Sequence, residues 1–103
     1  MLDQLMGNME QSQEALRQKL GSITIEQTSG DGAVTATING NGEITNLAID
    51  DEKLELSDTE QLEDLVIIAV NKAIVAAKEL EKTETTKQMK EMLPPGFGNL
   101  FGS

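Results

Sequence analysis

The sequence predicts an α+β fold in which a helix, a three-stranded antiparallel meander and a long second helix follow one another and pair into an intertwined homodimer. Apolar residues recur at helical spacing over residues 1–20, and they alternate with a period of two between residues 23 and 49. After residue 57 neither glycine nor proline occurs until Pro94. The 103 residues suffice for one small domain, whose core must be aliphatic because the chain has only two aromatic residues.

The first helix is predicted over residues 1–20, where polar residues separate the apolar ones. Its apolar positions are Leu2, Leu5, Met6, Met9, Leu16 and Leu20. Gly21 ends this helix, and Arg17 and Lys19 lie in its last turn, where cations suit the carbonyl end of the helix dipole. The segment has no basic leader and no unbroken apolar run, so we expect neither a signal peptide nor contact with a membrane. We therefore expect the protein to be cytoplasmic.

Two glycine-rich turns separate three predicted strands. SGDG at residues 29–32 joins the strand around Ile25 to the strand at residues 34–38, and NGNG at residues 39–42 leads into a third strand. NGNG is no dinucleotide-binding loop, because the third glycine is missing and a strand follows. Asn-Gly between alternating apolar runs is instead typical of a tight hairpin turn. The apolar positions of the third strand change parity between Ile44 and Leu47, which predicts either a β-bulge or a strand with both faces partly covered.

The second helix is predicted from Asp58 to about Leu93, with Ser57 and Glu60 forming a capping box. Its main apolar face comprises Leu62, Leu65, Val66, Ala69, Ala73, Ala76, Ala77 and Leu80. A second apolar group lies on the other side of the helix, at Ile67, Ile68, Ile74 and Val75. One short meander and one helix cannot cover both sides, so we expect this second group to form the interface of a homodimer. Beyond Leu80 we expect a solvated arm supported by Glu79/Lys82 and Glu84/Lys87 pairs.

Composition argues against an enzyme. The chain has no cysteine or histidine, which removes thiolate zinc sites and the side chains most used in catalysis near neutral pH. A divalent metal at Asp50, Asp51 and Glu52 is compatible with carboxylate chemistry, but neighbours in an extended segment point apart and no calcium-loop pattern is present. We therefore expect no metal and no cofactor, and we interpret this acidic run as a solvated turn.

Charge is unevenly distributed along a chain whose formal net charge is -10. Residues 21–56 hold seven acidic side chains and one lysine, whereas five lysines gather on one half of the second helix, at Lys72, Lys78, Lys82, Lys87 and Lys90. This lysine stripe is compatible with a solubilising face, or with a surface that contacts phosphates with Arg17 and Lys19 as minor contributors. No side chain is placed convincingly to read bases.

The order of elements, with GAVTATINGNGEITNLAID followed by LEDLVIIAVNKAI, resembles the YbaB/EbfC family of small bacterial nucleoid-associated proteins. The resemblance covers essentially the whole chain. It implies a homodimer with projecting long helices, non-enzymatic binding of double-stranded DNA with little sequence specificity, and a role in nucleoid organisation or gene expression. With so many acidic residues, we expect DNA binding to be weak and sensitive to salt.

The competing hypothesis is an acidic protein–protein interaction adaptor without DNA binding. Such an adaptor would use the acidic sheet edge or the tail at residues 94–103, which carries Phe97 and Phe101 among glycines and prolines. We accordingly divide the chain into one YbaB/EbfC-like domain at residues 1–93 and a flexible tail at residues 94–103, a possible site for a protein partner.

Overall fold

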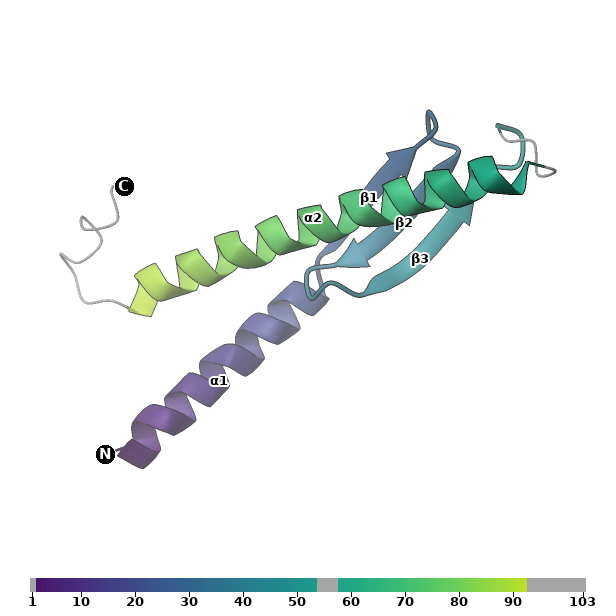
Figure 1. Ribbon diagram of the computed structural model, residues 1–103. Helices are drawn as coiled ribbons and strands as arrows, with labels where there is room; N and C mark the ends of the chain where they lie inside the picture. Colours follow the sequence, from purple (N-terminus) through teal and green to yellow (C-terminus); the bar gives the residue numbers. More distant parts are fainter. Residues whose placement is uncertain (1, 54–57, 93–103) are drawn as a thin grey trace.

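The computed structural model describes residues 2–53 and 58–92, and it confirms the predicted α+β fold. Helix α1 (Leu2–Gly21) leads into strands β1 (Thr24–Ser29), β2 (Val34–Asn39) and β3 (Ile44–Ile49), and helix α2 (Thr59–Met92) follows. The strands form one antiparallel sheet in the order β1-β2-β3. Helix α2 packs on β1 and β2, while α1 and the second half of α2 project from the same end of the sheet (Figure 1). The predicted tail, with Phe97 and Phe101, lies outside the described residues.

The predicted bulge is present in β3. Val34 pairs with Ile49 and Ala36 with Leu47, but the register then shifts so that Ile38 pairs with Ile44. Directly opposed residues of antiparallel strands point to the same face of the sheet. The extra residue in β3 therefore brings Ile44 to the face that already carries Leu47 and Ile49. This is the same face on which the buried side chains of β2 meet α2.

The core between α2 and the sheet is built largely from small residues. Ala69, Ala73 and Ala77 of α2 are at most 2% exposed, and they recur every fourth residue along one face of the helix. Val34 and Ile38 of β2 are the largest fully buried side chains among the described residues. Alanine lets the helix lie close to the sheet, but it contributes little apolar area. The subunit consequently buries few large side chains.

The NGNG segment is a turn, as predicted, and it also holds the end of α1. The amide of Gly40 donates hydrogen bonds to the carbonyl oxygens of Leu20 (2.8 Å) and Ile23 (3.1 Å). Asn41 Nδ2 donates to the carbonyl of Arg17 at 2.9 Å. A Cβ atom at Gly40 would lie 2.6 Å from the Leu20 oxygen, so only glycine allows this approach. The turn thereby satisfies carbonyl groups of the last turns of α1.

Asp58 caps the start of α2. Its Oδ1 atom accepts a hydrogen bond from the amide of Gln61 at 3.0 Å, and its carbonyl accepts one from the amide of Leu62. The cap observed in the structure thus lies one residue after Ser57, which was expected to cap the helix and which lies outside the described residues.

Neither helix in the ranges 2–53 and 58–92 combines the length and the apolar character that a membrane span requires.

Candidate functional site

The second half of α2 carries a basic outer face. Three lysines and two threonines line one shallow depression there, and we call these five residues the lysine–threonine patch: Lys82, Thr83, Thr86, Lys87 and Lys90. All of them are separated by three or four positions from another member, which makes them neighbours on a helix. Within the described residues, none of the three lysines forms an ion pair. Their positive charge is thus available to a ligand.

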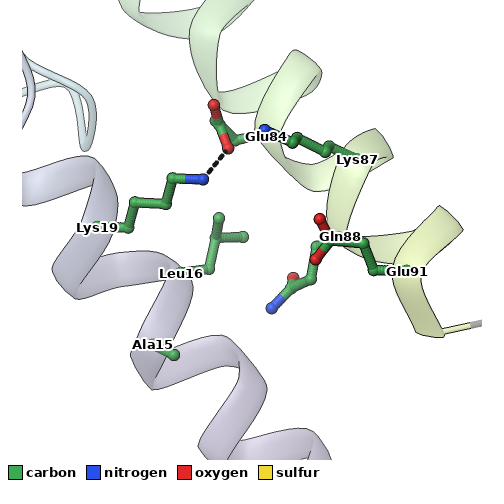
Figure 2. Close-up of a pocket in the computed structure, with 7 residues that line it drawn as sticks. All are labelled: Ala15, Leu16, Lys19, Glu84, Lys87, Gln88 and Glu91. Atoms are coloured by element: carbon green, nitrogen blue, oxygen red, sulfur yellow. Dashed lines mark ion pairs between the residues drawn. The ribbon is translucent and has the colours of Figure 1, made fainter.

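The inner face of the same helix segment is acidic and contacts α1. Lys19 Nζ lies 2.7 Å from Glu84 Oε2, and Gln88 Nε2 donates a hydrogen bond to the carbonyl of Ser12 at 2.8 Å. Figure 2 shows Lys19 reaching from α1 towards Glu84, with Glu91 further along the same inner face. The hydrogen bond from Lys19 holds the pKa of the Glu84 carboxyl below its ordinary value, although partial burial opposes this effect. Glu84 therefore forms its ion pair with Lys19, whereas Lys87 lowers the pKa of Glu84 only through its nearby charge and does not form the expected ion pair.

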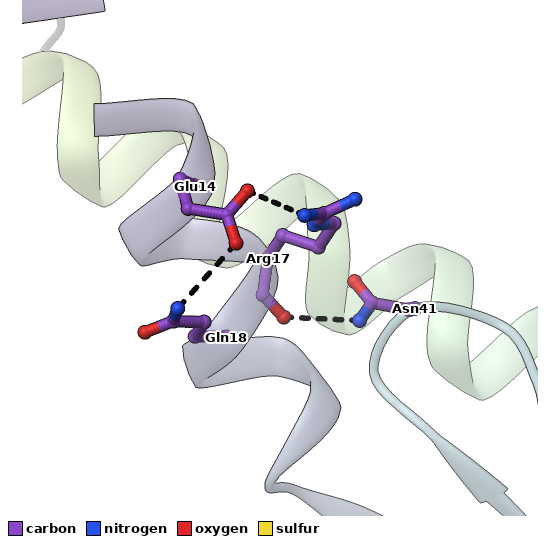
Figure 3. Close-up of polar contacts among 4 residues, drawn as sticks. All are labelled: Glu14, Arg17, Gln18 and Asn41. Atoms are coloured by element: carbon purple, nitrogen blue, oxygen red, sulfur yellow. Dashed lines mark hydrogen bonds and ion pairs between the residues drawn. The ribbon is translucent and has the colours of Figure 1, made fainter. Parts of the chain in front are cut away.

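Arg17 is also paired within the chain. Its guanidinium donates to the carboxylate of Glu14 one helical turn away, and the same carboxylate accepts a hydrogen bond from Gln18 (Figure 3). The hydrogen bond from Arg17 lowers the pKa of Glu14. Among the predicted phosphate contacts, Arg17 and Lys19 are thus already balanced by carboxylates. The first helix does lie beside α2, but its two cations do not extend the lysine–threonine patch.

Lys72 and Lys78 occupy different surroundings. Lys72 Nζ donates a hydrogen bond to the carbonyl of Thr28 at 2.6 Å, which ties α2 to the edge strand β1. Lys78 is exposed and lies one helical turn before Lys82. Of the five lysines predicted to contact phosphates, three lie together in the patch: Lys82, Lys87 and Lys90. Lys78 lies next to them, whereas Lys72 is hydrogen-bonded to the sheet.

The predicted dimer surface on α2 is exposed, with one exception. Ile67, Ile68 and Val75 are between 48% and 56% exposed. Ile74 is half-buried and packs against the core of its own chain. Because Lys72 contacts β1, the helix flank that carries Ile67 and Ile74 faces the other edge of the sheet, where β3 lies.

The sequence interpretation missed the contribution of β3 to this surface. All six residues of the strand are exposed, and Ile44, Leu47 and Ile49 are 41%, 41% and 42% exposed. Their face is the one that α2 covers over β1 and β2, but α2 does not extend over β3 (Figure 1). Ile67, on the flank of α2 that faces β3, is exposed as well, and we call these four residues the apolar strip: Ile44, Leu47, Ile49 and Ile67. The parity change in β3 could have revealed the strip, because a bulge that aligns three apolar residues implies a surface to be covered.

The acidic run at residues 50–52 forms a local turn. Asp50 Oδ1 accepts a hydrogen bond from the amide of Glu52 at 3.0 Å, and the Asp50 carbonyl accepts one from the amide of Lys53. In the part of the chain that the structure describes, no group of three or more acidic, histidine or cysteine side chains is arranged to hold a metal ion.

Comparison with known proteins identifies the family. The model of the YbaB/EbfC DNA-binding family matches residues 1–92, which include α1, the sheet and all of α2. The chain belongs to the YbaB/EbfC family. The resemblance inferred from the glycine turn and from the first half of the long helix is thereby confirmed.

Bacterial relatives of the family share most of the chain. A nucleoid-associated protein of Thermodesulfovibrio yellowstonii is 48% identical over 83 residues, which are 78% of this chain and 73% of the relative. A nucleoid-associated protein of Flavobacterium johnsoniae is 31% identical, with 94% of each chain covered. The crystal structure of an uncharacterized protein from Helicobacter pylori matches with a TM-score of 0.76 and 28% identity, covering 85% of this chain and 92% of that one.

Proposed function

We propose that this protein is a non-enzymatic, nucleoid-associated protein that binds double-stranded DNA through the lysine–threonine patch, with little sequence specificity. The observation that carries the proposal is the grouping of Lys82, Lys87 and Lys90 on the outer face of α2, where none of the three forms an ion pair among the described residues. Lysine binds phosphate as a point charge, and such contacts carry no base information. The protein would therefore contact the DNA backbone and act in nucleoid organisation or gene expression.

The face of α2 that turns towards α1 is unsuited to DNA. Glu84 and Glu91 line it together with Lys87, which borders both faces of the helix, and its one cation from α1, Lys19, is paired with Glu84. Phosphates approaching the space between the two helices would meet carboxylates. We therefore assign the DNA contact to the outside of the α2 arm, where Lys78 adds a further charge one turn before the patch.

We also propose that the protein acts as a homodimer. A second copy would cover the apolar strip of β3 and Ile67, which a single subunit exposes to water. A two-fold symmetric interface uses the same surface on both copies, so one continuous strip is sufficient. The small alanine core supports this view, since much of the large apolar surface of the chain would be buried only by pairing. Pairing would present two basic arms on one particle.

A salt series with matched charge variants tests DNA binding. Lys82→Gln/Lys87→Gln and Arg17→Gln/Lys19→Gln each remove two positive charges, but the second pair is already balanced by Glu14 and Glu84. We expect the first variant to weaken binding to a random duplex and to flatten the slope of log K against log salt by about 2. The second variant should change the slope by less than about half as much. Equal effects of the two variants would contradict the assignment to the patch.

The acidic adaptor is the second candidate, and the net charge of -10 favours it. An adaptor would give no gel shift with DNA even at low salt, because electrostatic binding to phosphates is strongest there. Its binding to protein partners would depend on residues 94–103. A shift at low salt that disappears steadily as salt is added would reject this alternative.

A further inference from the structure

We infer that Thr83 and Thr86 donate hydrogen bonds directly to DNA phosphates, so that the α2 arm docks against the DNA backbone rather than being held by long-range attraction. This inference rests on the proposed function. Both threonines are exposed and lie between the lysines of the patch. Thr83 is one turn from Lys87, and Thr86 is one turn from both Lys82 and Lys90.

The chemistry of the two side-chain types is different. Lysine is long and flexible, and its ammonium group attracts a phosphate from a distance. A threonine hydroxyl extends only one bond beyond Cβ, and its branched side chain has few rotamers. It therefore reaches a phosphate oxygen only if the helix surface itself touches the DNA. Threonine hydroxyls are among the common donors to phosphate in protein–DNA complexes.

The hydrogen-bond donors of the lysine–threonine patch extend over a length of helix that matches several phosphates of one DNA strand. From Lys82 to Lys90 the helix rises about 12 Å. One strand of duplex DNA carries about three or four phosphates over that length. The patch offers five donors on this stretch, and in the described residues no side-chain hydrogen bond within the chain competes for the hydroxyls of Thr83 and Thr86.

Thr85 supplies a matched control within the same helical turn. It has the same side chain, but it lies on the other side of α2, outside the depression that the patch lines. Valine replaces threonine without changing side-chain shape or branching, so Thr→Val keeps nearly the same helix propensity. Serine keeps the hydroxyl. The full-length protein is used throughout, with a random-sequence duplex as the probe.

We expect Thr83→Val/Thr86→Val to weaken duplex binding by at least about fivefold, because two hydrogen bonds at a solvent-exposed interface are lost. The salt slope should stay unchanged, since no cation is removed. Thr85→Val should bind as the parent does, and Thr83→Ser/Thr86→Ser should retain affinity.

Parent-like affinity of Thr83→Val/Thr86→Val would overturn the inference of direct threonine contacts. If Lys82→Gln/Lys87→Gln still weakened binding and flattened the slope, the proposed DNA function would stand without these contacts. If the lysine variant also left binding unchanged, the failure would be that of the proposed DNA surface itself.

Discussion

Lys19 Nζ lies 2.7 Å from Glu84 Oε2, and this ion pair joins the end of α1 to the second half of α2. Glu84 is the less exposed partner, with 15% of its side chain accessible against 52% for Lys19. The pair, drawn in Figure 2, is therefore the main charged link between two helices that leave the same end of the sheet at an angle to each other (Figure 1).

This ion pair predicts a dependence of helix spacing on pH. The hydrogen bond from Lys19 lowers the pKa of Glu84 in the folded protein. The ionised Glu84 carboxylate therefore contributes its full share of the stability at pH values above the ordinary glutamate pKa of about 4.3. That contribution is lost as the pH falls through the lowered pKa in the folded state. The hydrogen bond with Glu84 raises the pKa of Lys19, so the contribution of the lysine is lost only in strong alkali.

Distance measurements between spin labels would check this prediction. The chain has no cysteine, so labels can be attached at Gln13→Cys and Glu81→Cys, two exposed sites on the two helices. We expect the distance distribution to broaden in acid and, at neutral pH, in Glu84→Gln. The charge exchange Lys19→Glu/Glu84→Lys should restore the narrow distribution. A distribution that is equally narrow in all samples would show that the ion pair does not hold the helices.

Gly40→Ala should destabilise the protein and loosen the end of α1. The added Cβ would lie 2.6 Å from the Leu20 oxygen and 3.0 Å from Leu20 Cα, so the turn and the helix must separate. We expect a loss of about 2 kcal/mol in the free energy of unfolding, measured in urea. Gly42→Asn is the control, because Gly42 has a φ of 87° but open space around it, and asparagine tolerates positive φ. Equal stability of Gly40→Ala and the parent would contradict the close packing.

Asn39→Ala should remove the central contacts of the NGNG turn. Asn39 is 8% exposed, and its Oδ1 atom accepts hydrogen bonds from the amides of Asn41 and Glu43, both at 3.0 Å. Alanine leaves these amides without that acceptor, which costs about 1–3 kcal/mol. Thermal or urea unfolding measures the loss.

Asn39→Asp provides a pH-sensitive control for this turn. It keeps the acceptor oxygens but places a second carboxylate beside Glu43, whose Oε1 now accepts from Asn39 Nδ2 at 3.1 Å. This variant should be more stable than Asn39→Ala at acid pH, where the introduced carboxyl is protonated, and it should lose that advantage as the pH rises and the introduced carboxyl becomes charged. A constant difference between the two variants across this pH range would argue against the assigned contacts.

Leu47→Glu should prevent formation of the dimer. Leu47 lies in the apolar strip, and a charge buried there by a second copy would have no partner. Asn46→Glu adds the same charge to the same strand but on the opposite face, because Asn46 pairs with Thr37. Sedimentation at micromolar concentration should give a monomer for Leu47→Glu and a dimer for the parent and Asn46→Glu. A parent protein that remains monomeric would refute the proposed pairing.

Local sequence patterns predicted the elements and their order. The spacing of Leu62, Val66, Ala69 and Ala73 revealed the buried face of α2, and the parity change after Ile44 revealed the bulge. These features depend on periodicity and turn chemistry, which are properties of neighbouring residues. They are therefore readable from one chain.

Contacts between distant segments could not be predicted in the same way. A helical wheel places Glu84 beside Lys87, but it contains no information on α1, from which Lys19 reaches the carboxylate. In the same way, Lys72 belonged to the charged stripe on the wheel, whereas the edge of β1 provides its partner. Asn41 was predicted only as a turn residue, and its contact with Arg17 depends on where α1 ends relative to the sheet.

The bulge in β3 makes the effect of a deletion depend on its position. Deleting Thr45 would leave Ile44 opposite Ile38 in a regular ladder, and Ile44 would stay on the apolar face of the sheet. Deleting Ala48 would instead turn Leu47 to the opposite face, because no bulge absorbs the change of register there. The loss of Ala48 should consequently impair assembly more than the loss of Thr45.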